Sequence, residues 1–201
     1  MNVLRNDRRP LSKGAGIMLT EVFVPDTEPA TEWVLGRPVR KASPRRRHAL
    51  LQLRLGVLLS TWARGRGEVG TEWKFRLTLP GEYTRPLVPD VAYISYESLD
   101  AAGQRGAEEP LVAPDVAFEI YSPGDKQVRI AHKTAVYLQS GSLAVVHIEP
   151  QSRTIRCFTP EDDSPTVFTE GLTFVHSTLP GFTFALSTLF DVLDPNGESS
   201  T

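Results

Sequence analysis

Hydrophobic and polar positions follow two different periods along this chain, which predicts a mixture of helices and strands. The clearest helical pattern covers about 43–63, with Ser43 as the cap and Pro44 in the first turn. The expected apolar stripe of this helix consists of Ala49, Leu50, Leu53, Val57 and Leu58. A second helix is predicted over 125–140, capped by Asp125 and ended by Gly141.

Short runs of β-branched and aromatic residues, bounded by Gly and Pro, predict several strands. We expect them around a Gly36 turn at 32–39, and at 73–79, 87–96, 113–120, 143–149 and 154–159. Segment 97–109 is predicted to be a polar loop, and a final helical turn is expected near the end of the pattern. The order predicts an α/β fold of mixed α+β type, with helices packed on a mixed sheet.

Length and composition limit the organisation and setting of the protein. The 201 residues fit a single domain, which we expect over 18–194, with a disordered lead at 1–17 and a disordered tail at 195–201. A net charge of −2 argues against a globally basic nucleic-acid binder. The lone Cys157, the charged N-terminus and the lack of a long apolar stretch predict a cytoplasmic protein without a membrane span.

A Pro-Asp step occurs twice, in Val88-Pro89-Asp90 and in Ala113-Pro114-Asp115, each time before an apolar run. Proline suits the first residue of a strand, so Asp90 and Asp115 are expected at strand starts. Only the second run contains an acidic residue, Glu119. A buried carboxylate is costly unless a cation or hydrogen bonds meet it, which makes Glu119 the strongest chemical clue.

Lys133 lies on the predicted second helix, next to the face that should pack on the sheet. If Asp90, Glu119 and Lys133 project to one point, they form a site for Mg²⁺ or Mn²⁺ and a phosphate. Each feature also has a structural alternative. The Pro-Asp steps suit plain strand-entry turns, Glu119 suits an ion pair with an arginine, and Lys133 suits the edge of a helix.

Three successive arginines, Arg45, Arg46 and Arg47, stand at the start of the first predicted helix. Their charges oppose the helix dipole there, so phosphate contacts are one interpretation and a solvated basic surface is the other. The histidines are too scattered along the chain to predict a zinc site. The chain has no GxSxG motif and no glycine-rich phosphate loop, which argues against serine hydrolases and nucleotide-cofactor enzymes.

Taken in order, these motifs resemble the Uma2 family (DUF820) of restriction-endonuclease-like proteins, within the PD-(D/E)XK nuclease superfamily. The resemblance covers about residues 25–190. It is carried by Pro89-Asp90, Pro114-Asp115, Glu119-x-x-Ser122-Pro123 and Lys133-x-x-x-Tyr137-x-x-x-Gly141.

The resemblance implies a restriction-endonuclease-like core in which Asp90 and Glu119 hold Mg²⁺ or Mn²⁺. In the superfamily a lysine usually stands two positions after the Glu, where this chain has Tyr121, and Lys133 is expected to replace it. Glu32 and Asp115 match family positions and are expected to be accessory residues.

The implied activity is metal-dependent hydrolysis of phosphodiester bonds in DNA by an endonuclease. The alternative is a catalytically inactive nuclease fold that serves nucleic-acid binding or oligomerisation. A homodimer is a further expectation, because cutting both strands benefits from two sites.

Overall fold

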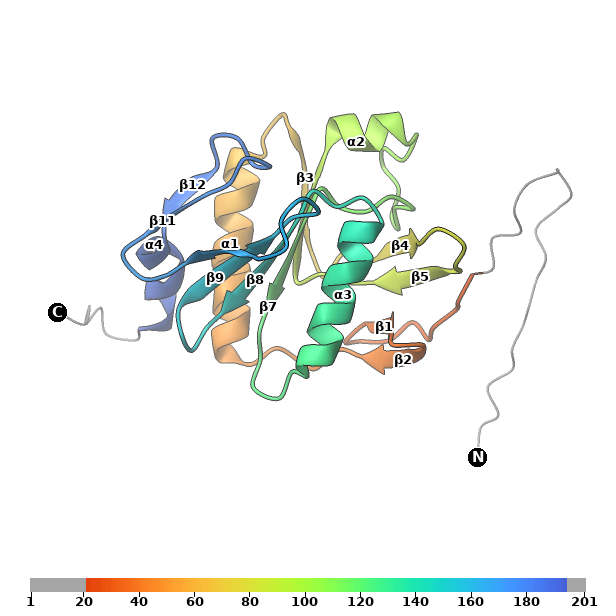
Figure 1. Cartoon of the computed structure of the whole chain (residues 1–201), viewed down its shortest axis with the longest axis horizontal. Coiled ribbons are helices and arrows are strands. Elements are labelled where there is room, and N and C mark those ends of the chain that lie inside the picture. Colours follow the sequence, from red (N-terminus) through yellow and green to blue (C-terminus); the bar gives the residue numbers. More distant parts are fainter. Residues whose placement is uncertain (1–20, 195–201) are drawn as a thin grey trace, which may run out of the picture.

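The computed structural model describes residues 21–194, and Figure 1 shows a central sheet with helices around it. The expected disordered ends, 1–17 and 195–201, lie outside the described residues. The six-stranded sheet has the order β10-β9-β8-β7-β6-β3. Its strands are β3 (Gly67–Thr71), β6 (Val91–Ser95), β7 (Val116–Ile120), β8 (Ala144–Glu149), β9 (Thr154–Phe158) and β10 (Thr166–Phe168).

One pair of neighbouring strands in this sheet, β7 and β8, is parallel, and the other neighbours are antiparallel. Parallel neighbours need a crossover, which α3 (Gln127–Gln139) provides. Three small hairpins surround the sheet: β1 (Thr31–Val34) with β2 (Arg37–Arg40), β4 (Phe75–Thr78) with β5 (Thr84–Leu87), and β11 (Thr173–Val175) with β12 (Thr183–Ala185). The mixed sheet flanked by helices confirms the predicted fold class.

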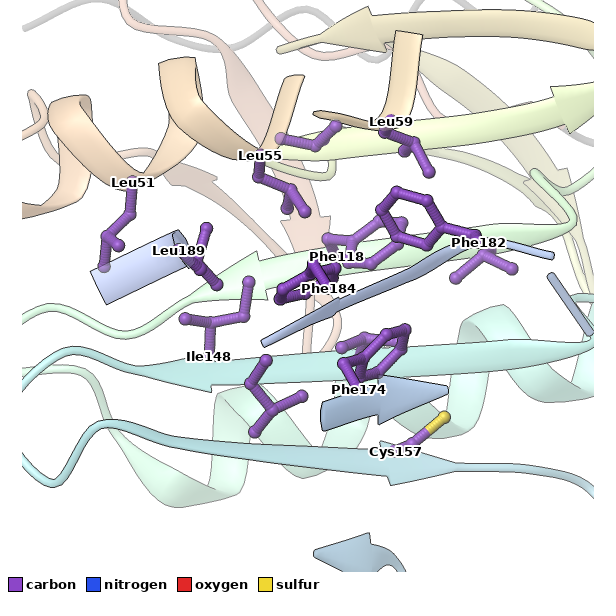
Figure 2. Close-up of a cluster of buried hydrophobic side chains, with 14 of the residues drawn as sticks. Leu51, Leu55, Leu59, Phe118, Ile148, Cys157, Phe174, Phe182, Phe184 and Leu189 are labelled. Atoms are coloured by element: carbon purple, nitrogen blue, oxygen red, sulfur yellow. The ribbon is translucent and has the colours of Figure 1, made fainter. Parts of the chain in front are cut away.

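Hydrophobic residues that alternate along the strands build a separate core on each face of the sheet. Against one face pack α1 (Arg46–Trp62) and α4 (Leu186–Phe190), which continues into a 3-10 turn at Asp191–Leu193. Figure 2 shows this core, where leucines of α1 meet the aromatic side chains of β7, β11 and β12. Against the other face pack α3 and the hairpin of β4 and β5.

Helix α1 differs from its prediction in its start and in its buried face. It begins at Arg46, with Arg45 in the cap position, rather than at Ser43. The fully buried side chains are Leu51, Leu55 and Leu59, whereas two residues of the expected stripe, Leu53 and Val57, are 67% and 53% exposed. Apolar residues occur on most sides of this helix, so its periodicity could not choose a face, and packing on the sheet decided it.

Several elements, including β5, were not predicted individually from the sequence. The short helix α2 (Tyr96–Ala101), capped by Ser95, lies where a loop was expected. Strand β3 follows α1 directly and was missed because it contains two glycines, which are poor strand formers. Gly67 fits there because a Cβ atom would lie 2.2 Å from the carbonyl oxygen of Ile94.

The remaining predictions agree to within a few residues, except that the expected strand at 87–96 is divided. Its first residue belongs to β5 and its main part to β6, with the Pro-Asp step between them. Among the described residues, no helix has both the length and the apolar composition needed to cross a membrane.

Candidate active site

The pairing of β6 with β7 brings Asp90 and Glu119 together. The strands are antiparallel, with Val91 opposite Phe118, so the residue before Val91 lies beside the residue after Phe118. The backbone N–H of Ile120 donates a hydrogen bond of 2.6 Å to Oδ2 of Asp90 and fixes this arrangement. The start of one strand and the end of its neighbour therefore form one site.

Asp90 is buried and lies next to two basic side chains. Its Oδ1 is 2.8 Å from Nζ of Lys41 and 3.5 Å from Nε2 of His48. Burial alone would raise the pKa of Asp90, but Lys41 and His48 hold it below its usual value. The carboxyl group is therefore ionised at neutral pH.

Glu119 faces Lys133, which α3 places over the end of β7. Nζ of Lys133 lies 2.6 Å from Oε1 of Glu119 and 2.8 Å from Oε1 of Glu32. The contact with Glu119 is an ion pair without hydrogen-bond alignment, so this buried oxygen has no hydrogen-bond partner. Burial raises the pKa of Glu119 to about 7, although Lys133 opposes this shift.

Glu32 connects Lys133 to the Pro-Asp turn. Its Oε1 accepts a hydrogen bond of 2.8 Å from the backbone N–H of Val88, as well as the contact from Lys133. Burial would lower the pKa of Lys133, but Glu119 and Glu32 raise it above the usual lysine value. Lys133 is therefore a fixed cation, and Glu32 holds it in position.

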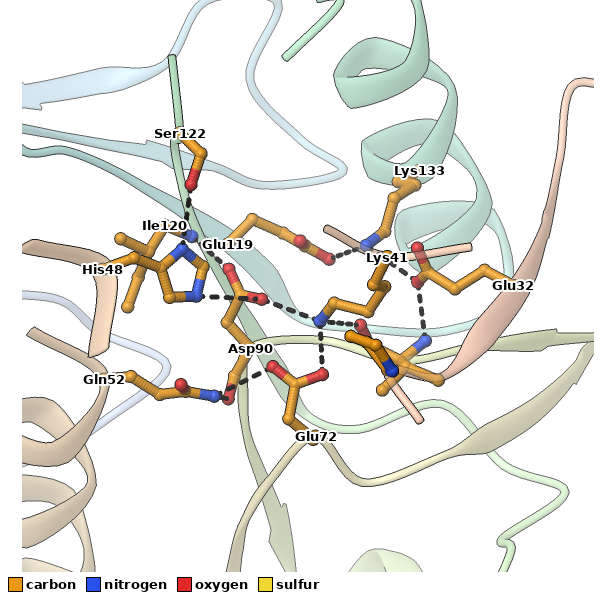
Figure 3. Close-up of polar contacts among 12 residues, drawn as sticks. Glu32, Lys41, His48, Gln52, Glu72, Asp90, Glu119, Ile120, Ser122 and Lys133 are labelled. Atoms are coloured by element: carbon orange, nitrogen blue, oxygen red, sulfur yellow. Dashed lines mark hydrogen bonds and ion pairs between the residues drawn. The ribbon is translucent and has the colours of Figure 1, made fainter. Parts of the chain in front are cut away.

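The residues around Asp90 form one group, which we call the Asp90 cluster, and several of them were not predicted from the sequence. The cluster consists of Glu32, Lys41, His48, Gln52, Glu72, Asp90, Glu119 and Lys133. Figure 3 shows Lys41, His48, Gln52 and Glu72 around Asp90. Gln52 donates hydrogen bonds to Oε1 of Glu72, at 3.0 Å, and to the backbone oxygen of Asp90, at 2.8 Å. His48 and Gln52 are polar residues four positions apart in a largely apolar helix, and this spacing was a usable signal. Lys41 and Glu72 lie in connections outside helices and strands, and neither was predicted to contact Asp90.

The cluster has an excess of negative charge that fits a divalent cation. Four carboxylates, those of Glu32, Glu72, Asp90 and Glu119, contact or lie beside the ammonium groups of Lys41 and Lys133, which leaves two negative charges in excess when every acid is ionised and His48 is neutral. Ligand atoms of His48, Glu72 and Asp90 lie within 4.8 Å of one another. This group, and the neighbouring carboxylates of Asp90 and Glu119, are oxygen-rich and fit Mg²⁺ or Mn²⁺.

Asp115, expected to be an accessory residue, lies at the end of β6 and β7 opposite to Asp90 and Glu119. Its Oδ2 accepts a hydrogen bond of 2.9 Å from the backbone N–H of Ser95, and its Oδ1 accepts one of 2.6 Å from Oγ of Ser98. Because β6 and β7 are antiparallel, the two Pro-Asp steps precede these strands at opposite ends of the pair. Asp115 therefore anchors the start of α2.

Arg45, Arg46 and Arg47 are exposed at the start of α1 and directly precede the buried His48. Their position places positive charge beside the Asp90 cluster. Arg46 also lies near the C-terminal part of the domain, where its Nη1 is 3.5 Å from the backbone oxygen of Leu193. All three side chains are exposed to solvent.

Comparisons with known proteins agree with this architecture. The family Uma2, described as "Putative restriction endonuclease", matches residues 21–187. The chain is also similar to a crystal structure from Anabaena variabilis ATCC 29413, described as a putative nuclease belonging to DUF820. The TM-score is 0.73 and the sequence identity 24%, over 85% of this chain and 94% of that chain.

A search among curated proteins found no match. The structural similarity shows that the fold is restriction-endonuclease-like. The family match covers most of the chain, including every residue of the Asp90 cluster. On this evidence, the chain belongs to the Uma2 family.

Proposed function

We propose that this protein is a Mg²⁺- or Mn²⁺-dependent endonuclease that hydrolyses phosphodiester bonds in DNA. The observation that carries this proposal is the position of Asp90 beside the end of β7, where the backbone N–H of Ile120 binds its carboxylate and Lys133 of α3 contacts Glu119. The family description supports nuclease chemistry in general. The metal ion and the substrate are our inference from the charge and donor atoms of the cluster.

Asp90 and Glu119 are the residues that would hold the ion. A bound divalent ion supplies a Lewis acid that polarises the scissile phosphate and lowers the pKa of a coordinated water. Glu119 has to lose its proton before it can bind a cation, and its raised pKa makes this step sensitive to pH near neutrality.

Lys133 acts through its charge. Because Glu119 and Glu32 raise its pKa, the ammonium group stays protonated and cannot serve as a general base. It can donate a hydrogen bond to the attacking water and stabilise the negative charge that develops on the phosphate. Glu32 is the positioning residue for this ammonium group.

DNA would approach over the start of α1. The guanidinium groups of Arg45, Arg46 and Arg47 can contact phosphates on either side of the scissile bond. A homodimer, which would cut both strands, is also part of the proposal and can be tested by sedimentation velocity.

Cleavage of supercoiled plasmid in Mg²⁺ or Mn²⁺ tests the catalytic assignment. Asp90→Asn and Glu119→Gln should lower both the cleavage rate and Mn²⁺ affinity, the rate by about 100-fold or more. Lys133→Met should lose cleavage to a similar degree but keep Mn²⁺ binding. Glu161→Gln and Lys126→Met, at exposed positions, serve as matched controls. Equal cutting by all variants would show a contaminating nuclease and overturn the assignment.

A second candidate function is supported by the ion pairs themselves. Both candidate metal ligands already contact a lysine, Lys41 for Asp90 and Lys133 for Glu119. Such pairing would suit a nuclease fold that binds nucleic acid without cutting it. Retained DNA binding, with no Mn²⁺ binding at millimolar concentration and no cleavage, would favour this alternative.

A further inference from the structure

Lys41 holds an unusual place for a lysine that follows a short surface hairpin. Its side chain is 11% exposed and its ammonium nitrogen contacts three oxygen atoms. These are Oδ1 of Asp90 at 2.8 Å, Oε2 of Glu72 at 2.8 Å and the backbone oxygen of Val88 at 2.9 Å. The contacts with Asp90 and Val88 are hydrogen bonds, and the contact with Glu72 is an ion pair.

The same oxygen atoms are suitable ligands for a metal ion. Hard divalent cations prefer carboxylate and backbone carbonyl oxygens, and the ammonium of Lys41 contacts both kinds. His48 adds a nitrogen, because its ligand atom lies within 4.8 Å of those of Glu72 and Asp90. The atoms around Lys41 Nζ are therefore of the kinds that bind a metal ion, and the position already holds a positive charge.

The arrangement around Glu72 shows that this position is built and that one of its ligands reaches solvent. Gln52 donates hydrogen bonds to Glu72 and to the backbone of Asp90, which holds the two acidic residues side by side. The side chain of Glu72 is 40% exposed, whereas that of Asp90 is 4% exposed. An ion from solution can therefore reach the position through Glu72.

We propose that Lys41 occupies a second cation position beside the site of Asp90 and Glu119, and that its ammonium group replaces a second divalent ion. This inference rests on the proposed function for the first ion only. In two-metal nucleases the ions lie about 3.5–4 Å apart and share the charge of the reacting phosphate. In this chain one of the two positive charges belongs to the protein itself.

Removal of the ammonium group should open the position to a metal. Lys41→Met keeps most of the side-chain volume and frees the oxygens of Asp90 and Glu72. Mn²⁺ binding, counted by isothermal titration calorimetry and by the loss of free Mn²⁺ signal in EPR, should rise from one ion in the wild type to two. The double variant Lys41→Met/Glu72→Gln should return to one ion, because it lacks a ligand of the new position.

Lys74 provides a matched control. It also contacts two carboxylates, Asp26 and Glu109, each at 3.1 Å, but the Asp26 side chain is 93% exposed. Lys74→Met should leave the number of bound Mn²⁺ ions unchanged. If Lys41→Met does not fold, the count is made on Lys41→Gln, whose amide keeps a polar head without the charge.

The outcomes separate this inference from the proposed function. One ion in both the wild type and Lys41→Met overturns the second position and leaves the first intact. No ion in the wild type and one in Lys41→Met, lost again with Glu72→Gln, supports the cation position of Lys41 but overturns the proposed site of Asp90 and Glu119. No ion in either protein overturns both.

Discussion

His147, a residue of β8, lies between the hydroxyl groups of Thr134 and Tyr121, and its hydrogen bonds show which ring nitrogen carries the proton. Nε2 is 2.8 Å from Oγ1 of Thr134, whose own proton goes to the backbone oxygen of Ile130. Thr134 therefore accepts from Nε2–H, and Nδ1 accepts from the hydroxyl of Tyr121 at 2.5 Å. Burial, with the charges of Arg156 and Lys133, lowers the pKa of His147 to about 3. The imidazole is neutral and ties β7, β8 and α3 together.

This neutral histidine predicts a pH dependence of stability. The pKa of His147 is about 3 in the folded state and near 6.5 in the unfolded state, so its contribution is complete above pH 6.5 and is lost as the pH falls toward 3. The free energy of unfolding should lose up to about 1.4 kcal/mol per pH unit from this group. Urea unfolding of the wild type and His147→Phe at pH 4.5–7.5 measures the difference between the two slopes.

The comparison with His147→Phe is needed because Glu119 acts in the opposite direction. Its folded-state pKa is raised to about 7, so its contribution is lost as the pH rises through 7. Both proteins contain Glu119, and its contribution cancels in the difference. Parallel profiles for the two proteins would contradict the neutral assignment of His147.

At the scale of elements, α1 serves two purposes on two of its faces. One face carries Leu51, Leu55 and Leu59 into the core against the sheet. The neighbouring face carries His48 and Gln52 to the Asp90 cluster. Packing of the leucines therefore sets the rotation of the helix and the position of the two polar side chains.

Leu53 was predicted to be buried but is exposed, and Leu55 is fully buried although it was not in the predicted stripe, so the two residues offer a direct test of this rotation. Leu55→Ala, at a fully buried position, should lower the free energy of unfolding by about 2–5 kcal/mol because it leaves a cavity. Leu53→Ala, at a position 67% exposed, should change it by less than about 0.5 kcal/mol. Chemical denaturation measures both values, and equal costs would show that the helix is rotated differently.

The arginines at the start of α1 predict a salt dependence of DNA binding. Replacement of Arg45, Arg46 and Arg47 by alanine should weaken binding and reduce the slope of log K against log salt by about 0.9 for each lost phosphate contact. Fluorescence anisotropy with a labelled duplex, from 50 to 200 mM salt, measures the slope. Arg54→Ala/Arg64→Ala, exposed elsewhere on and after the helix, is the control. An unchanged slope in the triple variant would indicate a solvated basic surface.

At the scale of the whole molecule, strand direction gives the two Pro-Asp steps different roles. The antiparallel pairing of β6 and β7 places Asp90 with Glu119 at one end of these two strands and Asp115 with α2 at the other end. The parallel pairing of β7 and β8 requires a crossover, which α3 provides. This crossover brings Lys133 to Glu119, at the same end of the strands as Asp90.

Because Asp115 and Asp90 lie at opposite ends of the strands, the same Asp-to-Asn substitution should affect stability at Asp115 and cleavage at Asp90. Asp115→Asn should lower the free energy of unfolding by about 1–2 kcal/mol, because it weakens the hydrogen bonds to Ser95 and Ser98, and it should leave the cleavage rate unchanged. Asp90→Asn should abolish cleavage. Thermal unfolding and plasmid cleavage on the same preparations give both readouts, and a large loss of activity in Asp115→Asn would return this residue to the site.

The sequence by itself determined the features that depend on local geometry. Proline restricts the backbone beside it, so the Pro-Asp steps mark the starts of β6 and β7. The helical period places Lys133 on the inner side of α3, where it is buried. A lone carboxylate in an apolar strand signals that a cation must meet it, and Lys133 lies there.

Only the tertiary structure decided which of these residues meet. The direction of strand pairing separated Asp115 from Asp90, and packing on the sheet chose the buried face of α1. Lys41 and Glu72 reach Asp90 from connections about 20 to 50 positions away in the sequence, without a periodic pattern of their own. Such contacts arise from the free energy of the whole packed fold, which no local pattern encodes.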